Sequence, residues 1–119
     1  MTKEERMETA LTLHKKGCNC CQSVVMAYVD KLPIDNEAAM NVAAPFGRGL
    51  AGTREICGCV SGMAMVCGLT GHTADVRPLI EKFRKEHGDI VCARLLVSGK
   101  KPCPDMITST AGLLYDIDI

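Results

Sequence analysis

The sequence contains few aromatic residues and no surplus of either charge. Phe, Trp and Tyr make up 3% of the 119 residues, Trp is absent, and 14 Lys and Arg are balanced by 14 Asp and Glu. Nucleic-acid-binding proteins normally carry a basic surplus, and those that bind single strands also present aromatic rings for base stacking. We therefore expect no nucleic-acid partner for this chain.

The sequence also lacks a long apolar run and a convincing alternation of apolar and polar residues. The apolar run at 60–69 is shorter than the about 20 residues that span a bilayer. Four of the first six residues are charged, and the chain continues into an amphipathic pattern, unlike a signal peptide. We therefore predict a cytoplasmic protein without membrane insertion and with essentially no β-sheet.

Helix signals, in contrast, occur along the whole chain. Thr2 and Glu5 have the spacing of a capping box, Asn19 is a natural N-cap, and Gly17 and Gly88 are typical stops. These caps and the apolar spacing predict helices over 2–16, 20–31, 35–44, 57–69, 73–87, 90–97 and 105–116. The sequence thus predicts an all-α fold, a small helical bundle of about five to seven helices in one domain, 1–119.

The segment 56–68 is unusual because two thiols stand at the head of an apolar run. Cys57 and Cys59 come a few residues after a Gly-rich stretch, 47–52, and mark the predicted start of an uncharged helix. The first turn of a helix has unpaired N–H groups and the positive end of the dipole, and both favour the thiolate. The Gly-rich stretch lacks the ending of a phosphate-binding loop, so we interpret it as a tight turn close to Cys57.

The eight cysteines are the candidate functional residues. Because cytosolic disulfides are rare, metal binding or redox chemistry explains this number better than structural cross-links. Cys67, late in the apolar helix, is interpreted as a core residue. Four of the other thiols, if brought together, could hold an iron–sulfur cluster or a tetrahedral zinc ion. These candidates are Cys18, Cys20, Cys21, Cys57, Cys59, Cys92 and Cys103.

Spacing alone does not select a residue within the doublets 20/21 and 57/59. Successive helical residues point about 100° apart, so Cys20 and Cys21 cannot both face one point in the core. Cys103 stands between two prolines in a predicted loop, 98–104, where the stiff backbone would hold its thiol in place.

Several short motifs resemble the family of redox-active proteins named for a C–GCAxxG–C–C cysteine pattern. Residues 17–24 (GCNCCQSV) resemble the family's G-x-N-C-A-Q-x-V, and residues 57–62 (CGCVSG) are similar to its C-G-A-x-x-G. The Gly-rich stretch after Phe46, Cys92 with Leu95, and Cys103 before the last helix follow in the family's order. The resemblance runs from about residue 10 to residue 114 and implies a helical domain, and related domains are associated with iron–sulfur binding.

The resemblance also implies which thiols form the site. The family's four shared cysteines fall on Cys20, Cys57, Cys92 and Cys103. Cys21 and Cys59 stand where the family usually has alanine, and Cys18 and Cys67 are additional. These extra thiols leave open an exchange of ligands or a second thiol site.

We therefore predict a [2Fe–2S] or [4Fe–4S] cluster on the four shared cysteines, used for electron transfer or redox sensing. One alternative is a metal-free thiol–disulfide redox protein that uses the 18/20/21 and 57/59 thiols, and another is a zinc-binding helical module. The three histidines have no Ser or carboxylate at motif spacing, so hydrolase chemistry has no support and enzyme status is left open. The sequence does not identify the redox partner protein, and a homodimer stays open.

Overall fold

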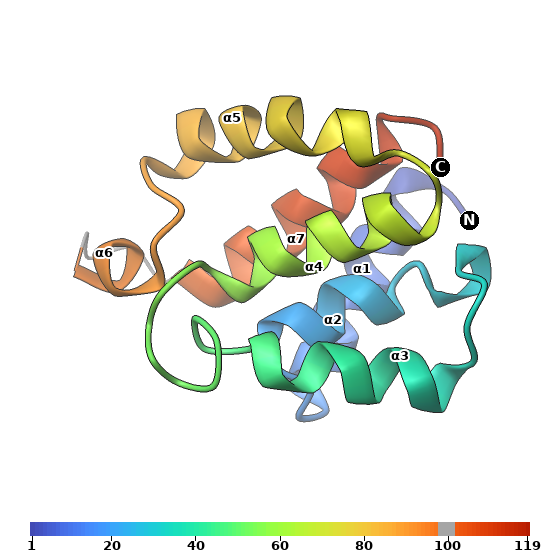
Figure 1. Ribbon diagram of the computed structural model, residues 1–119, viewed down its shortest axis with the longest axis horizontal. Helices are drawn as coiled ribbons and strands as arrows, with labels where there is room; N and C mark the ends of the chain where they lie inside the picture. The colour runs from blue at the N-terminus through green and yellow to red at the C-terminus, as the bar shows by residue number, and fades with distance from the viewer. Residues whose placement is uncertain (98–101) are drawn as a thin grey trace.

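The computed structural model describes residues 1–97 and 102–119, and for residues 102 and 103 it describes the backbone only. This part of the chain forms seven α-helices and no strand (Figure 1). The α-helices are α1 (Lys3–Lys15), α2 (Cys20–Met26), α3 (Asn36–Ala43), α4 (Gly58–Leu69), α5 (Val76–His87), α6 (Cys92–Val97) and α7 (Pro102–Tyr115). Short 3-10 turns, η1 (Val29–Lys31), η2 (Ala44–Phe46) and η3 (Thr73–Asp75), connect some of them. The predicted all-α fold and number of helices are confirmed.

The apolar helix α4 lies in the middle of the bundle (Figure 1). It packs most extensively on α2 and also contacts α5 and α7, while α1 packs along α7. The largest fully buried side chains come from α2, α4, α5 and α7 and the turn after α2; they include Tyr28, Met63, Leu79, Phe83, Ile107 and Leu114. Among the described helices, none has both the length and the apolarity that a bilayer crossing requires.

Both predicted N-terminal caps are present. The Thr2 hydroxyl accepts a hydrogen bond from the Glu5 N–H at 3.2 Å, and the Glu5 carboxylate accepts one from the Thr2 N–H at 2.8 Å. At α2, Asn19 Oδ1 accepts from the Gln22 N–H at 2.9 Å, and Gln22 Oε1 accepts from the Asn19 N–H at 3.0 Å. This second capping box fixes where α2 begins, and it therefore places Cys20 in the first helical turn.

One predicted helix ends earlier than expected. The pattern predicts a helix over 20–31, but α2 stops at Met26, and the chain continues as η1 after a break. Tyr28 at the break has φ −121° and is buried, and its hydroxyl donates a 2.6 Å hydrogen bond to the carbonyl of Ala111 in α7. The break thus lets Tyr28 connect the end of α2 to α7.

The starts of the last two helices also differ from the prediction. Cys92 is the first residue of α6 rather than one turn inside it, because the preceding residues are used for an extended contact with the Gly-rich loop. The last helix, α7, begins at Pro102 rather than near residue 105. Proline suits the first position of a helix because its fixed φ is helical and its missing N–H is not needed there. The backbone of Cys103 is therefore helical and not part of a loop.

Candidate functional site

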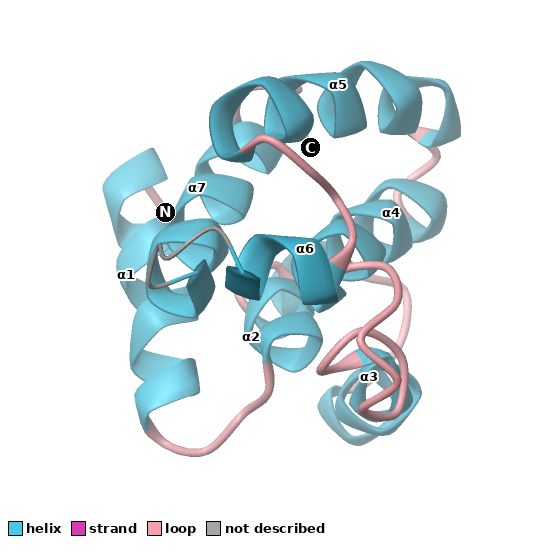
Figure 2. Cartoon of the chain, turned by 90° about the vertical axis from the view of Figure 1, so that its left-hand side faces the viewer, coloured by secondary structure: helices cyan, strands magenta, loops and turns pink. Residues whose placement is uncertain are grey.

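A cavity of about 40 Å³ lies where the starts of α2 and α4 meet the loop 47–57 and α6. These segments lie at one end of the molecule, which faces the viewer in Figure 2. Four cysteines line the cavity together with two arginines, a glycine and three apolar residues. They are Cys20, Arg48, Arg54, Cys57, Gly58, Cys59, Cys92, Leu95, Leu96 and Met106. Three of the four predicted ligands, far apart in the sequence, thus share one cavity.

A short backbone contact brings Cys57 and Cys92 to the same side of the cavity. Ile56 and Val91 form an isolated antiparallel bridge, in which the Cys57 N–H donates to the Ile90 carbonyl at 2.8 Å and the Cys92 N–H donates to the Glu55 carbonyl at 2.6 Å. Side chains alternate between the two faces of an extended strand. Residues 57 and 92 therefore lie on one face as diagonal neighbours, while Ile56 points the other way and is exposed.

Cys20 reaches the cavity because α4 begins with glycine. A Cβ added at Gly58 would lie 2.4 Å from Cys20 Sγ and 2.9 Å from the Phe46 carbonyl oxygen, and real Cβ atoms do not approach so closely. One turn later, a Cβ at Gly62 would lie 3.1 Å from the Cys21 carbonyl oxygen and from Val24 Cβ. The two glycines, four residues apart, lie on the same face of α4 and let it approach α2 closely. The sulfur of Cys20 occupies the place of the missing side chain.

Three thiols in this cavity are linked electrostatically. Hydrogen bonding from the Cys59 thiol lowers the pKa of Cys20 to about 6, although burial acts in the opposite direction. The backbone N–H of Arg48 in the loop also favours the Cys20 thiolate. The pKa of Cys57 is lowered too, mainly by Cys59 and then by N–H groups at the start of α4. The helix start and the Gly-rich loop therefore act on the thiols as their sequence positions suggested.

Cys59 is the donor in this group and stays protonated. Its side chain is 1% exposed, and its pKa is raised because its proton is held by the sulfurs of Cys20 and Cys57 and because it is buried. A thiol has one proton, so it serves one of the two neighbours at a time. The thiolate of the other cysteine is then stabilised by backbone N–H groups.

The remaining described cysteines do not line the cavity. Cys21 lies on another face of α2, with its sulfur 3.9 Å from the Met65 sulfur, and burial raises its pKa to about 12. Cys67 is a fully buried core residue, as predicted, and burial raises its pKa to about 11. Cys18 precedes the α2 cap and is partly exposed. Cys18 and Cys21 have Cys-x-x-Cys spacing, yet only Cys20, between them, lines the cavity.

The loop that covers the cavity has an unusual backbone. Four residues other than glycine have positive φ: Arg48 (56°), Leu50 (70°), Ala51 (52°) and Arg54 (62°). Each left-handed residue costs about 1 kcal/mol, so this loop is held in a conformation that its own residues disfavour. It is held by backbone hydrogen bonds, including those from Ala51 N to Pro45 O (2.6 Å) and from Glu55 N to Gly49 O (2.8 Å). The conformation places Arg54 Nη1 3.7 Å from Cys92 Sγ.

The donor set suits a soft metal centre, although the described residues do not complete one. Among the described residues that line the cavity, thiols are the only metal-ligating side chains of the Cys, His, Asp and Glu types, which favours iron–sulfur clusters or zinc over hard cations. Within residues 1–97 and 104–119, no three ligating side chains stand together in a metal-binding arrangement. Cys103, the fourth predicted ligand, lies outside the described side chains. The four-cysteine ligand set therefore stays a prediction.

A comparison with known families identifies the chain. The model of a family described as "Putative redox-active protein (C_GCAxxG_C_C)" matches residues 18–117, and the chain belongs to this family. The membership that the motifs suggested is therefore confirmed. Comparisons with curated proteins and with solved structures give no match.

The two arginines of the cavity are the part of the site that sequence reasoning missed. Arg48 and Arg54 stand inside and just after the Gly-rich stretch, where they look like ordinary solvated residues. A basic residue at each end of a loop that leads to a candidate thiolate is the signal that could have identified them.

Proposed function

We propose that this protein is a redox protein that binds an iron–sulfur cluster through Cys20, Cys57, Cys92 and Cys103. The single observation that carries the proposal is the shared cavity of the first three, which come from α2, α4 and α6. The family description, a redox-active protein, supports the same chemistry. When bound, such a cluster would accept and release one electron at a time.

The protein's own residues would prepare the thiolates and shield them. The lowered pKa of Cys20 and of Cys57 favours the ligating form at neutral pH. Leu95 and Met106 line the cavity from α6 and α7 and would keep water from the sulfurs. N–H groups near the sulfurs raise the reduction potential of such centres, whereas low solvent exposure lowers it because each added electron makes the cluster more negative, so the two features together would set the potential.

The test is elemental analysis of protein prepared without oxygen. We expect a brown protein that contains iron and acid-labile sulfide, and a Cys57→Ser variant that contains neither. Cys57 is the N-cap of α4, and serine is a favourable N-cap, so this variant should keep its helix. Cys67→Ala, a core change outside the cavity, is the matched control and should keep its iron.

Two results would contradict the cluster. Colourless, iron-free protein after anaerobic reconstitution with iron and sulfide would exclude it. Zinc without sulfide, together with loss of helical circular dichroism on chelation, would instead identify a zinc module.

Cys59 favours a second candidate function, thiol–disulfide exchange without metal. The Cys20 thiolate would attack a partner disulfide and release one partner thiolate. The sulfur of Cys59, after losing its proton to that thiolate, would then attack Cys20, form the Cys20–Cys59 disulfide and release the second partner thiolate. The partner gains two electrons, and this protein loses them. Mass mapping after treatment with a small disulfide tests this, and unchanged thiol counts in metal-free protein would exclude it.

A further inference from the structure

Most of the exposed large hydrophobic side chains belong to the two segments that line the cavity. In the described part of the chain, seven large hydrophobic residues are exposed, and four of them belong to the loop 47–57 and to α6. These four are Leu50 (45% exposed), Ile56 (40%), Leu96 (42%) and Val97 (85%). Leu96 itself lines the cavity. Because the bridge turns Cys57 and Cys92 inward, it turns Ile56 outward beside them.

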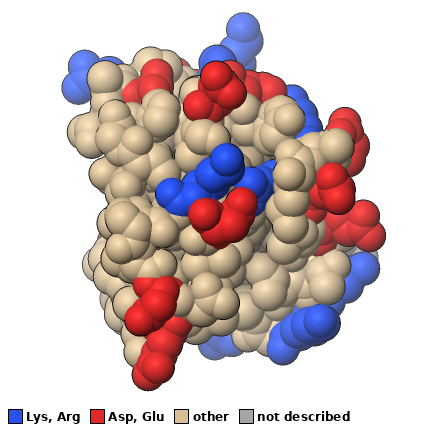
Figure 3. Space-filling model, turned by 90° about the vertical axis from the view of Figure 1, so that its right-hand side faces the viewer, with Lys and Arg blue, Asp and Glu red and all other residues tan. Residues whose placement is uncertain are grey.

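The same two segments carry basic side chains without acidic partners. Arg48 and Arg54 line the cavity, and neither forms an ion pair with a described carboxylate. Arg94 on α6 pairs at 3.6 Å with Asp89, which lies just before α6, and Glu55 is the one acid within the two segments. The segments therefore carry three arginines and a single carboxylate, and only Arg94 is paired by a neighbouring acid of the described chain. At the opposite end of the molecule, acidic and basic side chains are interspersed (Figure 3).

We propose that the loop 47–57 and α6 form a docking surface for an acidic redox partner protein. The exposed residues Leu50, Ile56, Leu96 and Val97 would contact an apolar spot on the partner, and Arg48 and Arg54 would contact carboxylates around that spot. This surface, which we call the rim, covers the cavity, so a partner seated on it would be adjacent to the thiols. The proposal deepens the proposed function and rests on it.

The make-up of the rim matches a transient complex. Encounters between electron-transfer proteins bury less than about 1,200 Å² in total, whereas a stable complex of standard size buries about 1,600 Å² and an obligate dimer about 2,000 Å² or more. Four apolar side chains with a few unpaired charges suit the smaller class. Exposed charges of this kind speed up the encounter more than they strengthen the complex, and salt screens them.

The experiment measures binding of a defined probe to isotope-labelled protein by amide NMR. The probe is a small acidic [2Fe–2S] ferredoxin in diamagnetic, gallium-substituted form, and a basic cytochrome c serves as the control for charge sign. We expect shift changes at residues of the rim with the ferredoxin alone. The affinity for the ferredoxin should fall about tenfold in Arg48→Glu and severalfold in Leu96→Ser. Moderate salt should also weaken the binding.

Matched variants away from the rim separate specific docking from general effects. Val42→Ser changes an apolar residue of similar exposure (48%) on α3, and Arg77→Glu reverses an exposed charge on α5. Both should bind the ferredoxin as the original protein does. The proposal would be overturned if these variants lost as much affinity for the ferredoxin as the rim variants do. Amide shift changes outside the rim, or equally strong binding of cytochrome c, would also overturn it.

Two further outcomes are informative. If sedimentation shows a dimer that Leu96→Ser dissociates, the rim is a contact between copies of this chain and the proposal is wrong. The binding readout does not depend on iron. Rim-specific binding by a protein that never takes up a cluster would therefore refute the proposed function and keep the docking surface.

Discussion

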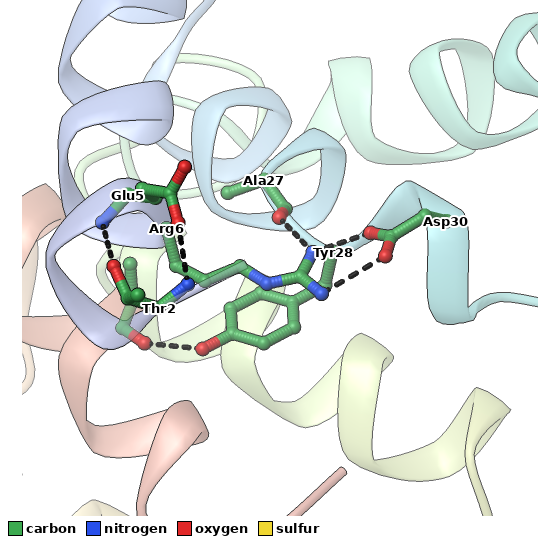
Figure 4. A network of polar contacts seen from close by, with 7 residues as sticks. Thr2, Glu5, Arg6, Ala27, Tyr28 and Asp30 are labelled. Atoms are coloured by element: carbon green, nitrogen blue, oxygen red, sulfur yellow. Dashed lines mark hydrogen bonds and ion pairs between the residues drawn. The ribbon is translucent and has the colours of Figure 1, made fainter.

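The molecule has arginines in two settings, and the settings differ in almost every physical respect. Arg6 on α1 is 3% exposed, lies over the Tyr28 ring with its guanidinium carbon 4.7 Å from the ring centroid, and donates to the Ala27 carbonyl at 2.9 Å (Figure 4). Its two terminal nitrogens bind both carboxylate oxygens of Asp30. Arg48 and Arg54, at the thiol cavity, are exposed and have no carboxylate partner among the described residues.

This difference separates an arginine whose charge stabilises the fold from arginines whose charge is available to a binding partner. Arg6 uses three of its five N–H donors on Ala27 and Asp30, lies against an aromatic face and is buried, so its charge is not accessible to a ligand. It holds α1 against the turn that follows α2. The cavity arginines lack such partners, so their charge is available to whatever approaches the cavity, and Arg54 also contacts the Cys92 sulfur. The predictions below test this division between a scaffold region and a reactive region.

The largest effect is expected from a single methyl group at the cavity. Gly58→Ala places a Cβ where the Cys20 sulfur lies, so the start of α4 or of α2 must move, at a cost of about 3 kcal/mol. Gly68→Ala, on the same helix, meets nothing within 4 Å and should stabilise the protein by about 0.5–1 kcal/mol. The free energy of unfolding in urea and the iron content should be measured for both variants. A Gly58→Ala protein with normal stability and iron would contradict the close packing of Cys20.

The second prediction concerns the acidity of Cys20 in metal-free protein. With a pKa of about 6, this thiol should ionise well below the usual range for cysteine. Ultraviolet thiolate absorbance should therefore rise near pH 6, and the step should vanish in Cys20→Ser but persist in Cys21→Ser. Because the folded pKa is the lower one, stability gained from this group grows as pH rises from about 6 toward the unfolded value and is lost below 6. Cys59→Ala should move the step upward, since its thiol is the main cause of the low pKa.

The third prediction compares the two kinds of arginine directly. Arg6→Met leaves Asp30 without its partner and removes several hydrogen bonds, so it should lower the free energy of unfolding by about 2 kcal/mol. We expect less than for a fully buried pair, because the Asp30 side chain is 54% exposed. Arg48→Met should change stability by less than about 0.5 kcal/mol. Equal losses in urea unfolding would show that the division between the two regions is wrong.

The smallest effect is expected at the helix caps. Thr2→Ala and Asn19→Ala each remove one capping box, and each should cost about 1 kcal/mol in thermal or urea unfolding. Only Asn19→Ala loosens the turn that carries Cys20, so only this variant should also shift the ultraviolet step of metal-free protein. A shift of that step in Thr2→Ala would contradict a local role for the Asn19 cap.

Much of the fold could be predicted from the sequence because its signals are local. The capping boxes at Thr2 and Asn19 and the stop at Gly88, which has φ 92°, depend on a few adjacent residues. The early end of α2 could not be predicted in this way. It depends on a hydrogen bond from Tyr28 to a residue 83 positions away, and no local pattern contains that partner.

The site could be predicted in chemistry but not in geometry. Thiols at helix starts indicated reactive sulfur, and the family motif indicated Cys20, Cys57 and Cys92. Neither signal showed that Cys59 would donate to two of these sulfurs, because that requires the α2–α4 distance that Gly58 and Gly62 set. The burial of Arg6 was also not predictable, since a charged residue on an amphipathic helix usually faces water.

The weak attachment of α6 makes the position of this helix sensitive to whatever binds in the thiol cavity. Among the described helices, α6 packs extensively on none, and its contacts with the rest include buried Leu95, the short 56–91 bridge and the backbone hydrogen bond from Ala93 N to Arg54 O. A group that binds the sulfur of Cys92 together with the cavity sulfurs at the starts of α2 and α4 would hold this weakly attached helix in place. If the proposed centre forms, filled and empty molecules would differ in how firmly α6 is held, and proteolytic cleavage within 92–97 would distinguish the two.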